Sequence, residues 1–454
     1  MSCCITNTVS VSSDPFVPYQ TWSEVDTQVT LRWLMRKILV LLMLPLAAGA
    51  EDFNVRDFGA KGDGGAKDTV AIQRAIDACA KAGGGRVVLM NGVFLTAPIR
   101  LLSNVEFHIA EGAVLRGSSD LADYPEWKEV KGIVNHDALP RMRNACLVLA
   151  DCVTNVAVTG MGVIDANGRS FVREKTGDWT GWQFERTVDP TKSMPRVFFF
   201  VGCRGLRVED VTLINGPAGW SYWIHDCDDV IFDRCRVKVD VRFPNNDGIH
   251  VNSSRDVIIR NCDLETGDDS IIVRANNRSL AENKVCERVV VSNCTMRSWS
   301  AGIRIGWTND GIIRNCVFRD LKMRDCTNGI SLSLPQQGGW NAYDYGREPT
   351  RFENLLFEDI EMDGVYGRPV FAFVESADKG TLCDGFYNVV LRRVRARCLE
   401  KPLLQGRADA IVRLTFDDCD FNVVSDAELP NYRRHGAADW CRRHGDTNRF
   451  AEIR

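Results

Sequence analysis

Short apolar runs recur along the central and C-terminal parts of the chain in one repeated arrangement. Each copy contains a β-type run, a polar pair, a small or apolar residue and a second short run. The copies cover residues 206–213, 230–237, 257–264, 289–296, 311–318, 355–362, 389–396 and 414–421. A cysteine fills the small position at 235, 262, 294, 316 and 419, so the first four lie 27, 32 and 22 residues apart. Variable periods of this length are typical of the coils of a solenoid.

The repeats predict an all-β fold, a single-stranded right-handed parallel β-helix over residues 51–424. A β-sandwich would need hairpins with two-residue glycine turns, and these are scarce here. Residues 69–81 carry apolar positions at helical spacing and are followed by the glycines at 83–85, which predicts a helix. Such a helix would cap the N-terminal end of the solenoid. The polar residues 425–454 are predicted to form a tail that covers the C-terminal end.

The recurring cysteine has a structural interpretation in this fold. Inward side chains of a solenoid stack on the same position of the next coil, and a buried cysteine behaves as a small apolar residue. The chain has 17 cysteines, without a CxxC pair or a compact Cys/His cluster of metal-ligand spacing. We therefore predict buried thiols. One or two disulfides are the alternative if the protein is in an oxidising compartment. Neither a metal nor a cofactor is predicted.

Two stretches interrupt the repeat, residues 167–196 and 334–352. Both carry glycines and aromatic residues, namely Trp179, Trp182, Phe184, Trp340, Tyr343 and Tyr345. Long loops on a rigid scaffold often shape a binding groove. Packing of these aromatic side chains against the outside of the solenoid is an equally weighted alternative.

The N-terminal segment indicates export. A basic start at Met35, an apolar run over residues 38–46 and the small residues Ala48 to Ala50 are typical of a secretory signal peptide at 35–50, with Glu51 as the mature start. Residues 1–34 precede this complete signal, so we interpret them as a non-native upstream extension. A periplasmic or extracellular location follows. The alternative is a cytoplasmic protein with a chance apolar patch.

Charge excludes some partners. The 56 basic and 60 acidic side chains give a formal net charge of −4, which does not favour nucleic acid or anionic membranes across the whole surface. This overall balance is compatible with a local basic cleft that binds an acidic substrate. We expect a monomer that does not associate with the membrane after signal cleavage.

One region concentrates carboxylates in two turns. Asp247 lies in residues 244–250, and Asp268 and Asp269 lie in residues 266–270. The 21 residues between Asp247 and Asp268 match one short coil, which would place them on neighbouring strands roughly 4.8 Å apart. Carboxylates this close raise at least one pKa, which suits a general acid, while an ionised neighbour can activate water. Glycosidic bond hydrolysis uses this division, although such sequences also form ordinary turns or Ca²⁺ sites.

These motifs resemble those of glycoside hydrolase family 28, the polygalacturonase-like enzymes of the pectin-degrading β-helix superfamily. The resemblance rests on residues 55–63, 71–77, 83–85 and 215–220, on His225, on Asn245 to Asp247 (Asn-Thr-Asp in the family) and on Gly267 to Asp269 (Gly-Asp-Asp). It implies an inverting hydrolase of pectic poly- or oligosaccharides. Carried over by position, Asp268 is the general acid, and Asp247 with Asp269 activates the water.

Two departures from the family pattern bear on the substrate. The family's Gly-His-Gly corresponds to Ser300 to Gly302, and its uronate-binding Arg-Ile-Lys corresponds roughly to residues 329–332, which contain no basic side chain. Arg274 and Arg304 could replace the missing groups as carboxylate clamps. The alternative for each arginine is an outward charge on a solvated face. A rhamnogalacturonan or a decorated pectin is therefore as plausible a substrate as polygalacturonan.

The candidate substrate-binding residues are Asn245, His250, Arg274, Arg304 and Trp340. For His250, as for His225, a structural role is the favoured alternative. Two other functions stay open: a β-eliminating pectin lyase, and a non-catalytic carbohydrate-binding β-helix.

Overall fold

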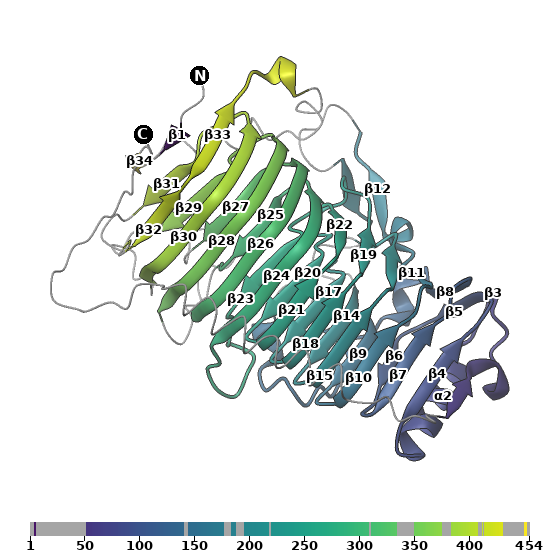
Figure 1. Cartoon of the computed structure of the whole chain (residues 1–454). Coiled ribbons are helices and arrows are strands. Elements are labelled where there is room, and N and C mark those ends of the chain that lie inside the picture. Colours follow the sequence, from purple (N-terminus) through teal and green to yellow (C-terminus); the bar gives the residue numbers. More distant parts are fainter. Residues whose placement is uncertain are drawn as a thin grey trace.

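The computed structural model describes residues 4–5, 51–139, 144–176, 183–187, 195–217, 219–307, 310–333, 349–374, 383–406, 411, 413–429 and 449–451. The predicted signal peptide, Trp340 and most of residues 430–454 lie outside these ranges. In the described part of the chain, no helix is long and apolar enough to cross a membrane. Strands stack side by side into an elongated solenoid, from α2 (Thr69–Lys81) at one end to β33 (Cys419–Val423) at the other (Figure 1).

The narrower of the two large sheets is called the site sheet. Its strands, in spatial order, are β6 (Ile99–Leu101), β9 (Cys146–Asp151), β14 (Arg196–Val201), β17 (Tyr222–His225), β20 (Ile249–Asn252), β23 (Ile271–Arg274), β25 (Ala301–Ile305), β27 (Asn328–Ser333), β29 (Val370–Val374), β31 (Leu403–Gly406) and β34 (Arg449–Ala451). All neighbours from β6 to β31 pair in parallel, and β34 pairs with β31 antiparallel.

The second large sheet is called the broad sheet. Its strands are β1 (Cys4–Ile5), β2 (Asp52–Asn54), β3 (Asp63–Lys67), β4 (Gly85–Leu89), β5 (Gly92–Thr96), β7 (Val105–Ile109), β8 (Ala113–Gly117), β10 (Thr154–Thr159), β11 (Val163–Asp165), β15 (Arg204–Glu209), β16 (Thr212–Ile214), β18 (Asp228–Asp233), β19 (Arg236–Lys238), β21 (Arg255–Arg260), β22 (Asp263–Thr266), β24 (Cys286–Ser298), β26 (Ile312–Cys326), β28 (Thr350–Val365), β30 (Cys383–Cys398), β32 (Leu414–Asp417) and β33. From β24 to β30, one long strand spans what two short strands span in the earlier coils and again in the last coil.

Shorter elements complete the description. They are the hairpin of β12 (Val172–Glu174) with β13 (Phe184–Arg186), and the 3-10 turns η1 (Val55–Phe58), η2 (Leu121–Asp123), η3 (His136–Ala138), η4 (Gly168–Phe171) and η7 (Asp426–Glu428). Crossovers between parallel strands of one sheet are right-handed as a rule. The predicted right-handed parallel β-helix is confirmed.

The predicted cap is also confirmed. Helix α2 buries Ala71, Ile72, Ala75 and Ile76 in the main core, so one stripe of the helix covers the apolar end of the first coils. The helix ends where Gly83 takes a φ of 100°, a conformation that is strained for residues with a Cβ.

Polar residues in the left-handed conformation form the corners of the coils. On the broad sheet, one series of corners includes Asp256, Asn315 and Asn354, and a second includes Asn261, Asn293 and Asp320, all with φ between 50° and 59°. Asparagine and aspartate tolerate this conformation better than most residues. Asparagine side chains also stack between coils, as where Asn354 donates to Asn315 at 3.1 Å.

The recurring cysteines were predicted to occupy one equivalent position on successive coils, and only part of them do. Cys235, Cys262 and Cys294 occupy equivalent positions on successive coils, but the next equivalent residue is Leu321. Cys316, predicted in this series, instead belongs to the other corner of its coil, where it pairs with Leu355. Both corners place a polar left-handed residue before a buried one, so the local patterns look alike.

Thirteen cysteines whose side chains the structure describes are free thiols, and twelve of these are buried. Burial raises the pKa of thiols such as Cys286 and Cys326 to about 12, so they behave as inert core residues. The expectation of buried thiols is confirmed for the described part of the chain.

Candidate active site

The three acidic side chains lie where two strands of the site sheet begin. The Gly248 N–H donates to the carbonyl of Asp269 at 3.0 Å, and the Ser270 N–H donates to the carbonyl of Ala301 at 3.0 Å. Together with the pairing of β20 with β23 and of β23 with β25, this stacks Asp247, Asp269 and Ala301 on successive coils. The residue in register with Asp247 is therefore Asp269, whereas the sequence spacing indicated Asp268.

Asp268 is held beside this stack by two donors. Its Oδ1 accepts the Asp269 N–H at 3.0 Å, and its Oδ2 accepts from Nδ2 of Asn245 at 3.2 Å. Arg186, from the interrupting stretch after β11, donates to Oδ1 of Asn245 at 2.6 Å. Burial, followed by the charge of Asp269, raises the pKa of Asp268 to about 7. This carboxyl group therefore carries a proton over much of the neutral and acidic range.

Asp269 is bound by a cation of the protein itself. Arg304 contacts both of its carboxylate oxygens, with Nη2 3.2 Å from Oδ1. The Ala301 N–H also donates to Oδ1 at 2.9 Å. Although burial opposes the charge on Arg304, the carboxylate of Asp269 raises the pKa of that guanidinium. Both partners of this ion pair are largely removed from water.

Asp247 has a different environment. Its Oδ1 is buried without a hydrogen-bond partner among the described residues, and its Oδ2 lies 3.8 Å from Nδ1 of His250. Burial raises its pKa well above the ordinary value, and the charges of Asp268 and Asp269 add to this. A buried polar atom without a partner normally has water or a ligand as its missing partner. Asp247 is thus the carboxyl group of the three with an oxygen left to accept a proton.

Aromatic rings pack beside Asp247. The His250 ring lies 3.9 Å from the Trp220 ring, and the Arg196 guanidinium lies 4.5 Å from Trp220 and 3.9 Å from Trp223. Burial lowers the pKa of His250 well below its usual range and that of Arg196 to about 9. His250 is therefore neutral.

The remaining candidates lie apart from the carboxyl cluster or outside the described residues. Arg274 donates through Nε to both oxygens of Asp310, at 2.9 and 2.6 Å, so this arginine is engaged within the protein. His225 accepts from Asn252 at Nδ1 and lies 2.8 Å from Oγ of Ser279 through Nε2. Burial lowers the pKa of His225 to about 3. Trp340 is not among the described residues.

The site therefore contains one carboxyl group paired with arginine and two with raised pKa values. In the described part of the chain, no three His, Cys, Asp or Glu side chains gather in an arrangement that could hold a metal ion. Two carboxyl groups that disfavour each other's ionisation share protons as a pair. Such a pair can supply one acid and one base at the same pH.

Comparison with known proteins gives a family match over the part of the chain that contains the three carboxyl groups. The sequence profile described as "Glycosyl hydrolases family 28" matches residues 129–372. The chain belongs to glycosyl hydrolases family 28. A second profile, "Rhamnogalacturonase A/epimerase, pectate lyase-like", matches residues 53–168. The recognition of family 28 from the sequence motifs is thereby confirmed.

Two relatives illustrate the sequence similarity. An exo-poly-alpha-D-galacturonosidase of Dickeya chrysanthemi is 30% identical over 384 residues, covering 69% of this chain and 62% of that protein. A probable polygalacturonase of Vitis vinifera is 25% identical over 294 residues, covering 63% and 58%. The chain thus spans about 60% of the length of these two relatives.

Solved structures show the same fold. An exopolygalacturonase of Thermotoga maritima gives a TM-score of 0.62 at 22% identity, covering 86% of this chain and 96% of that one. The endo-xylogalacturonan hydrolase of Aspergillus tubingensis gives 0.61 at 16% identity, covering 82% and 93%.

Some residues of the site have no family motif to mark them. Arg186 lies in a stretch that interrupts the repeat, and no sequence signal connects it with Asn245. Arg196 opens an apolar strand, and only its position as a charge within that run sets it apart. Arg304 was expected to contact substrate, but its partner is Asp269. Asp310, the partner of Arg274, follows a stretch without a repeat pattern.

Proposed function

We propose that this protein is a glycoside hydrolase that cleaves a pectic poly- or oligosaccharide with inversion of configuration. The observation that carries the proposal is the different environment of the three carboxyl groups. Asp268 is protonated near neutral pH, Asp269 is paired with Arg304, and Asp247 has an oxygen without a partner among the described residues. Cleavage of a glycosidic bond by inversion needs one carboxylic acid and one carboxylate.

Each carboxyl group then has a role that follows from its contacts. The pKa values of Asp247 and Asp268 are both raised, so the pair keeps a proton. The family motif assigns this proton to Asp268, which protonates the oxygen of the leaving sugar. Asp247 accepts a proton from the attacking water through its open oxygen. Asp269 contributes its negative charge to the site, while Arg304 and the Ala301 N–H occupy its oxygens. The sequence motif assigned water activation to Asp247 and Asp269 together; the contacts favour Asp247.

The names of the relatives support a galacturonan-type substrate. Arg304 and Arg274, expected to bind a substrate carboxylate, both have carboxylate partners in the protein. Recognition of the sugar therefore involves other groups, and we propose polygalacturonan or rhamnogalacturonan as the substrate class. The signal-like segment at 35–50 supports export to the periplasm or the extracellular space.

The test is product analysis with Asp268→Asn. The purified protein is incubated with polygalacturonan and rhamnogalacturonan, and new reducing ends are counted. We expect hydrolysis by the unaltered protein and a loss of at least about 100-fold in kcat for the variant, because general acid catalysis contributes roughly 10² to 10⁴. Asp320→Asn, on the broad sheet, is the matched control. NMR of the first product reports the anomeric configuration, and an unsaturated product would indicate β-elimination. Full hydrolysis by Asp268→Asn would disprove the acid assignment.

A further inference from the structure

One row of side chains runs along the outer face of the site sheet, with one residue from each strand. Leu149, Phe199, Trp223, His250, Ile272 and Arg304 follow each other in register from β9 to β25. Residues next to them along the strands, such as Val148 and Phe198, belong to the main core inside the solenoid. Because side chains alternate between the faces of a strand, the row faces outward.

The first part of this row is covered by another part of the chain. Residues 121–139, called the cover segment, connect β8 with β9. Its Val130, Ile133 and Leu139 form a separate apolar cluster with the outward residues of β9, β14 and β17. Leu149 and Phe199 are completely buried there. The outer face of these three strands is therefore dry protein interior and does not offer a surface to a sugar chain.

Specific contacts hold the cover segment in place. Asp151, at the end of β9, accepts the N–H groups of Lys131 at 2.8 Å and Gly132 at 3.0 Å. The Asn144 side chain bonds both the N–H and the carbonyl of Trp127, at 2.9 and 2.8 Å. A Cβ on Gly132 would lie 2.5 Å from Cγ2 of Val201, so the backbone of the segment lies directly on the sheet.

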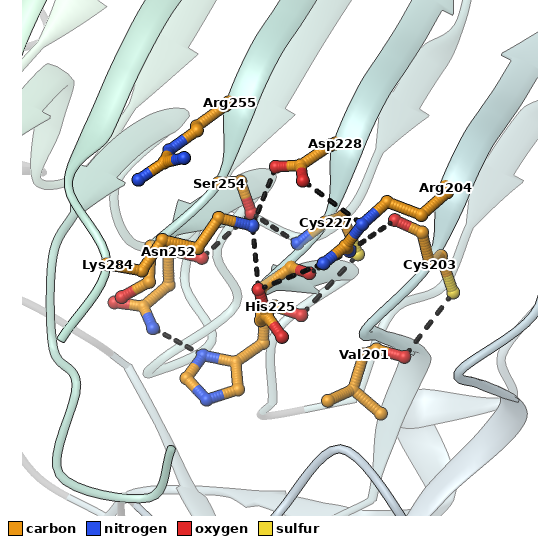
Figure 2. Close-up of polar contacts among 12 residues, drawn as sticks. Val201, Cys203, Arg204, His225, Cys227, Asp228, Asn252, Ser254, Arg255 and Lys284 are labelled. Carbon is orange, nitrogen blue, oxygen red and sulfur yellow. Dashed lines mark hydrogen bonds and ion pairs between the residues drawn. The ribbon is translucent and has the colours of Figure 1, made fainter. Parts of the chain in front are cut away.

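A second segment extends the cover to the next strand. Residues 275–285 follow β23 and are anchored by Lys284, whose Nζ lies 2.6 Å from both Asp226 and Asp228 (Figure 2). Ser279 joins the two segments, because its carbonyl accepts the Val134 N–H at 2.9 Å and its hydroxyl contacts His225. The ion pair and these hydrogen bonds close the face beside β17 and β20.

The cover ends beside the catalytic carboxyl groups. Trp220 packs against the covered cluster and also contacts the ring of His250. Asp247 lies in the turn that leads into the strand of His250. Strands of a sheet are about 4.8 Å apart, so the three covered strands account for about 14 Å of the path along the solenoid. A polysaccharide lying along this face would have to pass through the cover to continue in that direction.

We propose that the cover segment and residues 275–285 block one side of the site, so that the enzyme cleaves its polysaccharide only at a chain end. The inference rests on the proposed hydrolase function and adds the mode of attack. The length of sugar chain on the covered side of the carboxyl groups is then limited, and the rest of the chain extends toward β25 and β27. There the row continues with Arg304 and Ser331.

The time course of digestion tests the inference. A chain-end enzyme releases short products of uniform size while viscosity falls slowly relative to new reducing ends. An internal ladder of oligomers with an early fall in viscosity would overturn the chain-end mode and leave the hydrolase function intact. Absence of cleavage with every pectic substrate would overturn both. Oligosaccharides with a bulky fluorophore at one end supply a second readout. A label at one end is expected to prevent cleavage and a label at the other end to be tolerated; tolerance of both labels would contradict the inference.

A substitution in residues 275–285 tests the role of this segment in blocking the site. Lys284→Met removes the anchor of residues 275–285, and we expect a several-fold rise in the share of internal products. The matched control is Lys238→Met, which removes an ion pair with Asp263 and Glu265 on the broad sheet. An unchanged product pattern in Lys284→Met would refute the part assigned to this segment. If the variant does not fold, the digestion pattern of the unaltered protein still decides the mode of attack.

Discussion

Replacement of Asp268 by asparagine is expected to abolish activity and yet to stabilise the protein at neutral and alkaline pH. The site raises the pKa of Asp268 from its ordinary value of 3.8 to about 7, through burial and the charge of Asp269. Above pH 7 the folded protein must keep an ionised carboxylate in this environment, whereas in the unfolded chain the same group is in water. Asparagine is neutral at every pH and does not carry this cost.

The magnitude follows from proton linkage. Between pH 3.8 and about 7 the folded chain binds more protons at Asp268 than the unfolded chain does, so stability is lost as pH rises through this window. At 1.36 kcal/mol for each tenfold change in proton affinity, the penalty reaches about 4 kcal/mol at pH 8 and about 1 kcal/mol at pH 4.5. Asparagine has one carbonyl oxygen for the donors Asn245 and Asp269, and the lost hydrogen bond costs about 1 kcal/mol. The free energy of unfolding of the variant should therefore exceed that of the unaltered protein by about 3 kcal/mol at pH 8 and by almost nothing at pH 4.5.

Urea unfolding of both proteins at the two pH values measures this difference. Asp320→Asn is the control, because its carboxylate is 55% exposed and substitutions of this kind change stability by about 0.5 kcal/mol or less. The reasoning is refuted if Asp268→Asn changes stability equally at both pH values. It is refuted also if the variant is less stable at pH 8, because the carboxylate would then be favoured in the folded site and unsuited to act as the acid.

Three further outcomes follow from the same structure. Arg304→Met leaves Asp269 without its cation, so we expect a loss of about 3 to 5 kcal/mol in unfolding free energy. Arg314→Met removes an arginine on the broad sheet that is 40% exposed, and its partner Glu287 keeps Arg288, so the cost should be about 1 kcal/mol or less; equal losses would contradict the buried-pair assignment. As pH rises, kcat should fall above about 7 because Asp268 loses its proton. As pH is lowered, kcat should fall when Asp247 gains a proton, at a pH above the ordinary aspartate range; an acid limb near 4 would contradict this. Finally, thiol titration after unfolding without reductant should find at least the 13 free cysteines, and a smaller count would reveal disulfides.

The sequence predicted the elements whose signal repeats or is local. Inward apolar positions recur on every coil, so the solenoid was predictable from their pattern. Helix α2 has its own 3.6-residue periodicity, and the carboxyl groups lie in short motifs of the family. Each of these signals can be recognised within one coil or one helix.

Register was harder to predict, because it depends on the number of residues in each turn. The coil has two corners with the same local pattern, and Cys316 was therefore assigned to the wrong one. A shift of one residue also placed Asp268, in place of Asp269, opposite Asp247. One residue is enough to exchange the faces of a strand, so an assignment from spacing alone is fragile here.

Contacts between distant segments had no sequence signal at all. Nine of the 19 residues of the cover segment are apolar, but the segment lacks the repeat pattern of the coils. Its role becomes visible only where Val130 and Ile133 meet Phe199 and Trp223. Arg186 and Asn245, 59 residues apart in the chain, likewise contact each other only through the fold.

The substitution of the family's histidine and the presence of Arg304 are connected by this geometry. Ala301 occupies the central position of the motif, in register with Asp269, and offers that carboxylate its backbone N–H. Arg304, three residues later on the same strand, reaches the same carboxylate with its guanidinium. A histidine would change its charge near neutral pH, whereas arginine keeps its charge throughout. One carboxylate of the three is thus neutralised at every working pH, and Asp247 and Asp268 are left to divide a single proton between the roles of base and acid.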